Sequence, residues 1–154
     1  MSTKNLEERP TSVRYYPDGK TASIMEWRRK GLLHRENGKP ASIAFWENGN
    51  VQLERFFENG VSHRDGGLPT TVTYYEDGAV ELEFWENSSL SSYSRDNDLP
   101  AIIGYDPDGS VVRKEWCLEG KPYREGGKPE IEIYKNGKLV EIVKGGIVTE
   151  VSAA

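Results

Sequence analysis

Five prolines recur through the chain at intervals of 30, 29, 31 and 29 residues, at Pro10, Pro40, Pro69, Pro100 and Pro129. Each precedes a short run that leads into an aromatic residue and then a glycine turn. Residues 40–49 and 69–78 match along their whole length without a gap. A constant period of this size indicates a tandem repeat, whose units are too small to bury an apolar face alone and must stack on their neighbours. The chain is therefore predicted to be an array of about five units of ~30 residues.

Each unit contains two segments of strand length. The first segments, residues 12–16, 42–46, 71–75 and 102–105, alternate β-branched and aromatic residues and end in Asp-Gly or Asn-Gly turns, a pattern that predicts β-hairpins. In Pro17-Asp18-Gly19 the proline sets the first φ angle of the turn and the glycine takes a positive φ. The expected inner face carries Val13, Ile43, Val72 and Ile103 together with Tyr15, Phe45, Tyr74 and Tyr105.

The second segments are expected to end at an aromatic residue, at Trp27, Phe57, Trp85 and Trp116. In three units a second turn with glycine follows, at residues 29–31, 58–60 and 118–120, whereas the third unit has Ser88 in place of that glycine.

The fifth unit differs in length, because Pro129 and Gly137 are eight residues apart where the other units have nine. An alignment on Gly137 places Ile131 and Ile133 on the inner face, puts Tyr134 in the position of Tyr75, and assigns the missing residue to the preceding loop. This alignment assumes that the apolar pattern outweighs the proline position, since a shift of one residue turns every side chain of a strand over.

The predicted fold is all-β, a curved antiparallel meander of ten or eleven short strands. Residues 1–8 are expected to be an N-terminal tail, residues 9–146 the single repeat domain, and residues 147–154 a C-terminal strand or tail. No stretch has a helical period with caps.

Composition limits the kinds of partner and environment. A net charge of −5 and a pI near 5.2 argue against a protein that binds double-stranded nucleic acid. The single cysteine, Cys117, cannot form an internal disulfide, and no apolar run has the ~20 residues of a membrane span. We therefore expect a cytoplasmic protein without a membrane span.

The order of aromatic residue, Asn/Asp-Gly turn, second strand, aromatic residue and Asn-Gly turn resembles the membrane occupation and recognition nexus (MORN) repeats, especially the bacterial variant of the YwqK antitoxin type. The closest matches are residues 75–78, 45–49 and 57–60, and the resemblance covers residues 9–145. It implies a single-layer antiparallel sheet used for binding or scaffolding, with no common enzymatic activity.

The segments before the prolines, which we name the connections, are residues 34–40, 63–69, 93–100 and 123–129. In each of them an arginine is followed directly by an acidic residue, and a ring usually precedes it. The candidate binding residues are His34, Arg35, His63, Arg64, Tyr93, Arg95, Tyr123 and Arg124. In one interpretation each arginine holds the repeat together by bonding carbonyls or carboxylates of a neighbouring unit. In the other, the row offers planar donors and stacking faces to a phosphate or carboxylate.

Two further candidates lie on the opposite strand face from the inner aromatic residues. Trp46 and Tyr75 directly follow Phe45 and Tyr74, and adjacent strand residues point to opposite faces. This second aromatic row is expected either to bind a partner or to be covered by the curl of the sheet.

Catalytic and metal-binding motifs have little support in the sequence. His34 and His63 occupy equivalent repeat positions and would have to converge across a unit to hold a metal, and 106–109 is a turn sequence rather than a calcium loop. No cofactor is expected, and the chain is not expected to be an enzyme.

Two functional hypotheses remain from different classes. The first is a non-catalytic binding module that engages and neutralises a protein partner, as an antitoxin, immunity or phage counter-defence protein does. The alternative is a homo-oligomer that sequesters an anionic nucleotide signal through Arg, His and Tyr residues. A third hypothesis is a purely structural scaffold protein. Local function is expected where the repeats differ, at Ser88, Ser94 and Tyr123.

Overall fold

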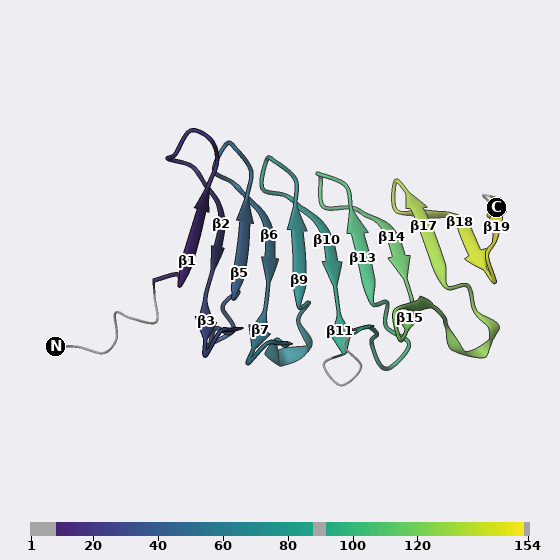
Figure 1. The fold of residues 1–154 in the computed structure, drawn as a ribbon. Helices are drawn as coiled ribbons and strands as arrows, with labels where there is room; N and C mark the ends of the chain where they lie inside the picture. The colour runs from purple at the N-terminus through teal and green to yellow at the C-terminus, as the bar shows by residue number, and fades with distance from the viewer. Residues whose placement is uncertain (1–8, 88–91, 153–154) are drawn as a thin grey trace.

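A computed structural model describes residues 9–87 and 92–152, and shows a single antiparallel sheet in which the strands follow chain order (Figure 1). The eleven strands of this sheet are β1 (Ser12–Tyr15), β2 (Ala22–Glu26), β5 (Ser42–Phe45), β6 (Val51–Arg55), β9 (Thr71–Tyr74), β10 (Val80–Phe84), β13 (Ile102–Tyr105), β14 (Val111–Glu115), β17 (Ile131–Lys135), β18 (Lys138–Lys144) and β19 (Ile147–Glu150). The prediction of an all-β meander is confirmed, and the last strand forms within the range expected for it. The expected tail at 1–8 lies outside the described residues.

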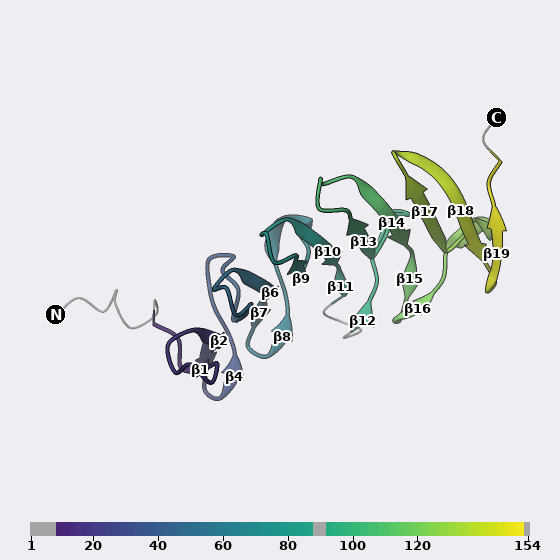
Figure 2. The same ribbon diagram turned by 90° about the horizontal axis from the view of Figure 1, so that it is seen from above.

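Four short hairpins extend from one end of the long strands, where the sequence indicated only turns. They are β3 (Arg28–Arg29) with β4 (Leu32–Leu33), β7 (Phe57–Glu58) with β8 (Val61–Ser62), β11 (Glu86–Asn87) with β12 (Ser92–Tyr93), and β15 (Cys117–Leu118) with β16 (Lys121–Pro122). Asn59 and Gly60, for example, have φ angles of 49° and 78°, as a two-residue hairpin turn with two positive φ angles requires. Seen from above, the short hairpins lie to one side of the long strands (Figure 2). Ser88 lies outside the described residues.

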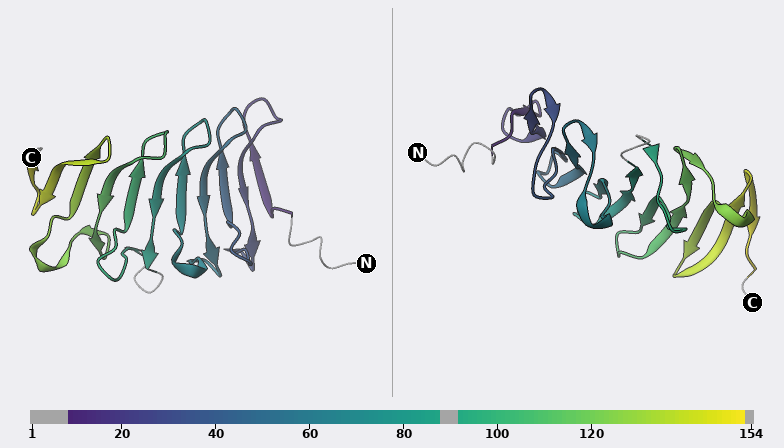
Figure 3. Two further views of the ribbon diagram at one scale, coloured as in Figure 1. Left: turned by 180° about the vertical axis from the view of Figure 1, so that it is seen from behind. Right: turned by 90° about the horizontal axis from the view of Figure 1, so that it is seen from below.

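The long hairpin of each of the five units contains a register shift at the same place, whereas the final pair, β18 with β19, has none. The second strand has one extra residue opposite the end of the first strand, at Ser23, Gln52, Glu81, Val112 and Val140. Such a β-bulge interrupts side-chain alternation and increases the local twist. The bulges explain why the second segments alternate irregularly in the sequence, and the array twists progressively from β1 to β19 (Figure 3).

The alignment of the fifth unit on Gly137 is wrong. Glu132 of β17 pairs with Lys114, in the position that Ile103 takes against Glu83 one unit earlier. Tyr134 pairs with Leu139 beyond the bulge, as Tyr105 pairs with Val111. Tyr134 is therefore equivalent to Tyr74 and Tyr105, as the proline spacing indicates.

The missing residue of the fifth unit comes from the hairpin turn and not from the preceding loop. Lys135 pairs directly with Lys138, and Asn136 and Gly137 between them have φ angles of 51° and 73°. This two-residue turn replaces the longer loops of the other units. Because the missing residue belongs to the turn, the strand itself keeps its register. Glu132, and not Ile131 or Ile133, therefore lies on the strand face that carries Val72 and Ile103 in the earlier units.

The most buried side chains lie where the long strands meet the short hairpins. The aromatic residue after each second strand is 2–9% exposed, at Trp27, Phe56, Trp85 and Trp116. Ala41 and Ala101, each next to a repeat proline, are fully buried. The equivalent residue in the second unit is thus Phe56 and not Phe57, because the backbone N–H of Phe56 donates to Thr70 O at 2.9 Å, as that of Trp85 donates to Ala101 O at 2.8 Å.

No helix in the described part of the chain is long and apolar enough to cross a membrane.

The register at Phe56 and Phe57 gives a stability test. Phe56→Ala removes a 2% exposed ring at a unit junction and is expected to lower the free energy of unfolding by about 3–5 kcal/mol. Phe57→Ala, in the half-buried β7, is expected to cost clearly less. Urea unfolding of both variants measures the difference, and equal losses would contradict the register described above.

Candidate functional site

The four connection arginines all stack on the buried aromatic residue of their own unit. The guanidinium carbon lies 3.6–4.0 Å from the ring centroid in the pairs Arg35–Trp27, Arg64–Phe56, Arg95–Trp85 and Arg124–Trp116. A cation placed over an aromatic face contributes about 0.5–2 kcal/mol, with the larger values in desolvated sites. The stack is therefore a repeated stabilising element of the array.

The same arginines also fix the path of the connections. Each Nη1 donates to the carbonyl of the proline five residues later, at Pro40, Pro69, Pro100 and Pro129, with distances of 3.1–3.4 Å. The backbone N–H of the residue before each arginine donates to the carbonyl of the stacked aromatic residue, as from His34 to Trp27 at 3.0 Å. Since these contacts recur in all four units, they favour the structural interpretation of the arginine row.

Neighbouring units are joined through tryptophan and histidine side chains. Trp85 Nε1 donates to Gly67 O at 2.8 Å, and Trp116 Nε1 donates to Asp98 O at 2.9 Å. His34 is buried, and its Nδ1 accepts the backbone N–H of Asn59 in the next unit at 3.0 Å. These bonds hold each connection against the unit that follows it.

Arg124 has an additional set of partners. Its Nε and Nη2 donate to the two carboxylate oxygens of Asp98 at 2.8 and 3.3 Å, and its Nη1 donates to Glu132 Oε1 at 2.8 Å. Lys128 Nζ lies 2.6 Å from the Asp98 carboxylate. Hydrogen bonds from Arg124 and then Lys128 lower the pKa of Asp98 to about 2. Arg124 is thus fully engaged by this chain.

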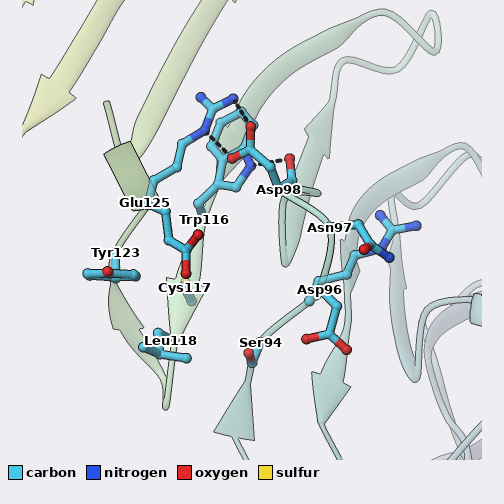
Figure 4. Close-up of a pocket in the computed structure, with 11 residues that line it drawn as sticks. Ser94, Asp96, Asn97, Asp98, Trp116, Cys117, Leu118, Tyr123 and Glu125 are labelled. Atoms are coloured by element: carbon cyan, nitrogen blue, oxygen red, sulfur yellow. Dashed lines mark hydrogen bonds and ion pairs between the residues drawn. The ribbon is translucent and has the colours of Figure 1, made fainter. Parts of the chain in front are cut away.

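Open grooves separate successive connections. The groove between connections 93–100 and 123–129 has a volume of about 380 Å³ (Figure 4). Tyr123 and Leu118 line one side of it, and Ser94 and Asp96 line the other. The equivalent groove one unit earlier, between 63–69 and 93–100, has a volume of about 270 Å³. The array therefore presents grooves at the unit boundaries, and Ser94 and Arg95 line both of these two.

Cys117 lines the larger groove, and its thiol is a poor nucleophile. Burial, followed by the nearby carboxylate of Glu115, raises the pKa of the Cys117 thiol to about 11. Because the thiolate is the reactive form, this thiol stays protonated and weakly reactive at neutral pH.

The second aromatic row links units. Trp46 Nε1 donates to Tyr74 O at 3.1 Å, and the Tyr75 hydroxyl donates to Tyr105 O at 2.8 Å. Tyr16 reaches Phe45 O in the same way at 2.7 Å. These side chains are half-buried at the turn end of the long strands, away from the grooves. The structure thus does not bring Trp46 and Tyr75 together with the connection residues.

The histidines form separate local contacts. His63 Nε2 lies 3.0 Å from Asp65 Oδ1, whereas His34 bonds Asn59. Within residues 9–87 and 92–152 no group of three or more His, Cys, Asp or Glu side chains is arranged to hold a metal ion.

Most of the exposed large apolar side chains lie on the short hairpins and connections. We name these seven residues, each 39–51% exposed, the hairpin edge: Leu32, Val61, Leu68, Tyr93, Leu99, Leu118 and Tyr123. The other described residues of this kind, Tyr15, Ile147, Val148 and Val151, lie at the two ends of the long sheet. Only the two tyrosines of the hairpin edge were predicted as binding residues from the sequence. The leucines and the valine sit beside turns and prolines, where apolar residues are unusual, and that position was the available signal.

The Asp98–Arg124 pair makes stability depend on pH. The lowered pKa of Asp98 means that its ionised form stabilises the fold above its ordinary pKa of 3.8, and that this contribution is lost as the pH falls toward about 2. Asp98→Asn should therefore lower the melting temperature most at neutral pH, and the difference from the unsubstituted protein should shrink steadily as the pH falls from about 4 through about 2. Asp96→Asn is the control, because Asp96 lies in the same connection but makes no ion pair with the described residues. A difference that stays constant over this pH range would rule out the ion pair as its cause.

The chain has no match among protein-family models, curated proteins or solved structures.

Proposed function

We propose that this chain is a non-catalytic binding module that engages a protein partner through the hairpin edge. The observation that carries the proposal is the concentration of exposed apolar side chains on this one edge, beside open grooves. Exposed apolar patches rimmed by polar groups mark interaction sites, and aromatic anchors supply much of the binding energy in protein interfaces. Tyr93 and Tyr123 offer such anchors, with Leu68, Leu99 and Leu118 around them.

The proposed biological role is neutralisation of the bound protein, in the manner of an antitoxin, immunity or phage counter-defence protein. This role rests on the resemblance to the antitoxin-type repeats, and the hairpin edge supplies a surface suited to it. A cytoplasmic location belongs to the same proposal.

Sequestration of an anionic nucleotide has less support. Each connection arginine is stacked on a ring and bonds a proline carbonyl, and Arg124 is paired with two carboxylates. Multiple phosphates need several free donors that converge, and the arginine contacts do not offer such a set. The protein-binding proposal is therefore the better supported of the two.

Paired substitutions test the role of the hairpin edge. Leu68→Ser with Leu118→Ser removes two exposed leucines from it, whereas Ile147→Ser with Val148→Ser removes two exposed apolar residues from the sheet end. A partner is first isolated from host lysate with the unsubstituted protein, then purified and titrated calorimetrically against each variant. We expect the edge variant to lose about 10-fold or more in affinity, since each anchor is worth upwards of about 1 kcal/mol, and the sheet-end variant to bind normally.

The opposite result, in which the folded edge variant binds normally and the sheet-end variant does not, would reject the hairpin edge as the interface. Thermal shift with a nucleotide panel addresses the alternative, because a nucleotide that binds the native state raises the melting temperature by mass action.

A further inference from the structure

One position of the connections differs in a way that changes the charge of a groove. Equivalent residues two places before the repeat proline are Gly38, Gly67, Asp98 and Gly127, with φ angles of 65°, 67°, 54° and 66°. A positive φ disfavours any residue with a Cβ, and glycine is the usual occupant. Asp98 thus occupies a strained position, and its carboxylate holds Arg124 of the next unit at 2.8 Å.

Arg95 is placed against Gly67 as Arg124 is placed against Asp98. Both guanidinium groups stack on a tryptophan of their own unit, at 4.0 and 3.6 Å, and both bond a proline carbonyl at 3.4 Å. Each of those tryptophans donates to the carbonyl of the glycine or aspartate in question, at 2.8 Å for Gly67 and 2.9 Å for Asp98. The two sites therefore share one backbone frame.

The difference between them is the side chain at the glycine position. Gly67 supplies no carboxylate, and no described carboxylate lies within ion-pair distance of Arg95. A Cβ built on Gly67 would meet no atom within 4 Å, so the space in that direction is open. Burial lowers the pKa of Arg95, and the carboxylate of Glu83, which lies beyond ion-pair distance, offsets part of this effect.

The surroundings of Arg95 favour a carboxylate set among apolar groups. Leu68, half exposed, lines the same groove as Arg95. At the Asp98 site a second cation, Lys128, also contacts the carboxylate. The equivalent residue beside Arg95 is Leu99, so the Arg95 site lacks this second cation. Glu86 and Asp96 also line the groove, and their charges repel a doubly charged phosphate more strongly than a singly charged carboxylate. Arg64 and His63 also line this groove, Arg64 with a ring stack and a proline carbonyl of its own and His63 beside Asp65. A guanidinium next to an exposed leucine suits a carboxylate with apolar neighbours.

We propose that Arg95 receives an Asp or Glu side chain of the protein partner, in the position that Asp98 takes against Arg124. This inference rests on the proposed function, because it specifies what a partner brings to the hairpin edge. The partner's carboxylate would accept two parallel hydrogen bonds from Nε and Nη2 of Arg95, and its apolar neighbours would pack on Leu68 and Leu99. The groove beside Arg95 is thus a receptor for an acidic residue flanked by apolar residues.

Gly67→Asp tests the site by supplying the carboxylate from within the chain. Asp98 shows that an aspartate is accommodated at this φ angle, and Gly67→Asn is the matched control with the same shape and no charge. In a ¹⁵N-labelled protein, the Arg95 Nε–H signal is assigned by its loss in Arg95→Gln. It is then followed during titration with sodium acetate and, separately, with inorganic phosphate, against chloride at constant ionic strength.

The expected result is a saturable acetate shift in the unsubstituted protein, a reduced one in Gly67→Asn, whose neutral carboxamide fills the same space, and a response in Gly67→Asp at least 10-fold weaker than in Gly67→Asn. Asp98→Gly should make the Arg124 Nε–H signal responsive to acetate in the same way. The absence of a saturable acetate shift, an equal response in Gly67→Asp and Gly67→Asn, or a response to phosphate alone would each overturn the proposal.

The purified partner separates this inference from the proposed function. We expect Gly67→Asp to weaken partner binding at least 10-fold, and Gly67→Asn, which fills the same space without pairing with the arginine, to weaken it clearly less. If Gly67→Asp binds normally while the Leu68→Ser, Leu118→Ser variant does not, the carboxylate site is rejected and the proposed function stands. If acetate binds at Arg95 but partner binding is insensitive to the hairpin edge, the proposed function is rejected and only the anion site remains.

Discussion

The structure depends on the stack between an arginine and a buried aromatic ring, which recurs once in each of four units. A single-layer sheet has no second layer to cover its faces, so burial must come from contacts between successive units. The aromatic ring is enclosed at the junction of long strands and short hairpin, and the guanidinium covers it while fixing the connection through a proline carbonyl. Sheet, hairpins and grooves all follow from this junction.

Much of the fold could be predicted from the sequence because its signals are local. The prolines, the turn glycines and the alternation of the first strands report backbone angles and strand faces within a few residues. The bulges and short hairpins have no such signature, and a bulge erases the alternation that would reveal it. In the fifth unit the apolar pattern predicted the wrong strand register. The turn before Gly137 is one residue shorter than in the other units, so the proline and not the glycine marks the equivalent positions.

The candidate site could be located but not interpreted from the sequence. The repeated arginines were evident, yet their ring and carbonyl contacts join residues that are five to ten positions apart and depend on the folded connection. The contrast between Gly67 and Asp98 is visible in the aligned repeats, but its meaning requires the shared frame around Arg95 and Arg124. Trp46 and Tyr75, expected either to bind a partner or to be covered by the curl of the sheet, donate to the backbone of the next unit.

The recurrence of one bulge in each of the five units has a geometric consequence for any molecule that binds along the array. Each bulge adds twist, so successive units are rotated relative to one another (Figure 2), and the grooves at their boundaries follow a twisted path. A straight, rigid ligand could follow this path over only a short span, whereas one that curves with the same pitch could occupy several grooves at once. The number of repeats in contact is then set by the shape of the ligand as well as by its chemistry.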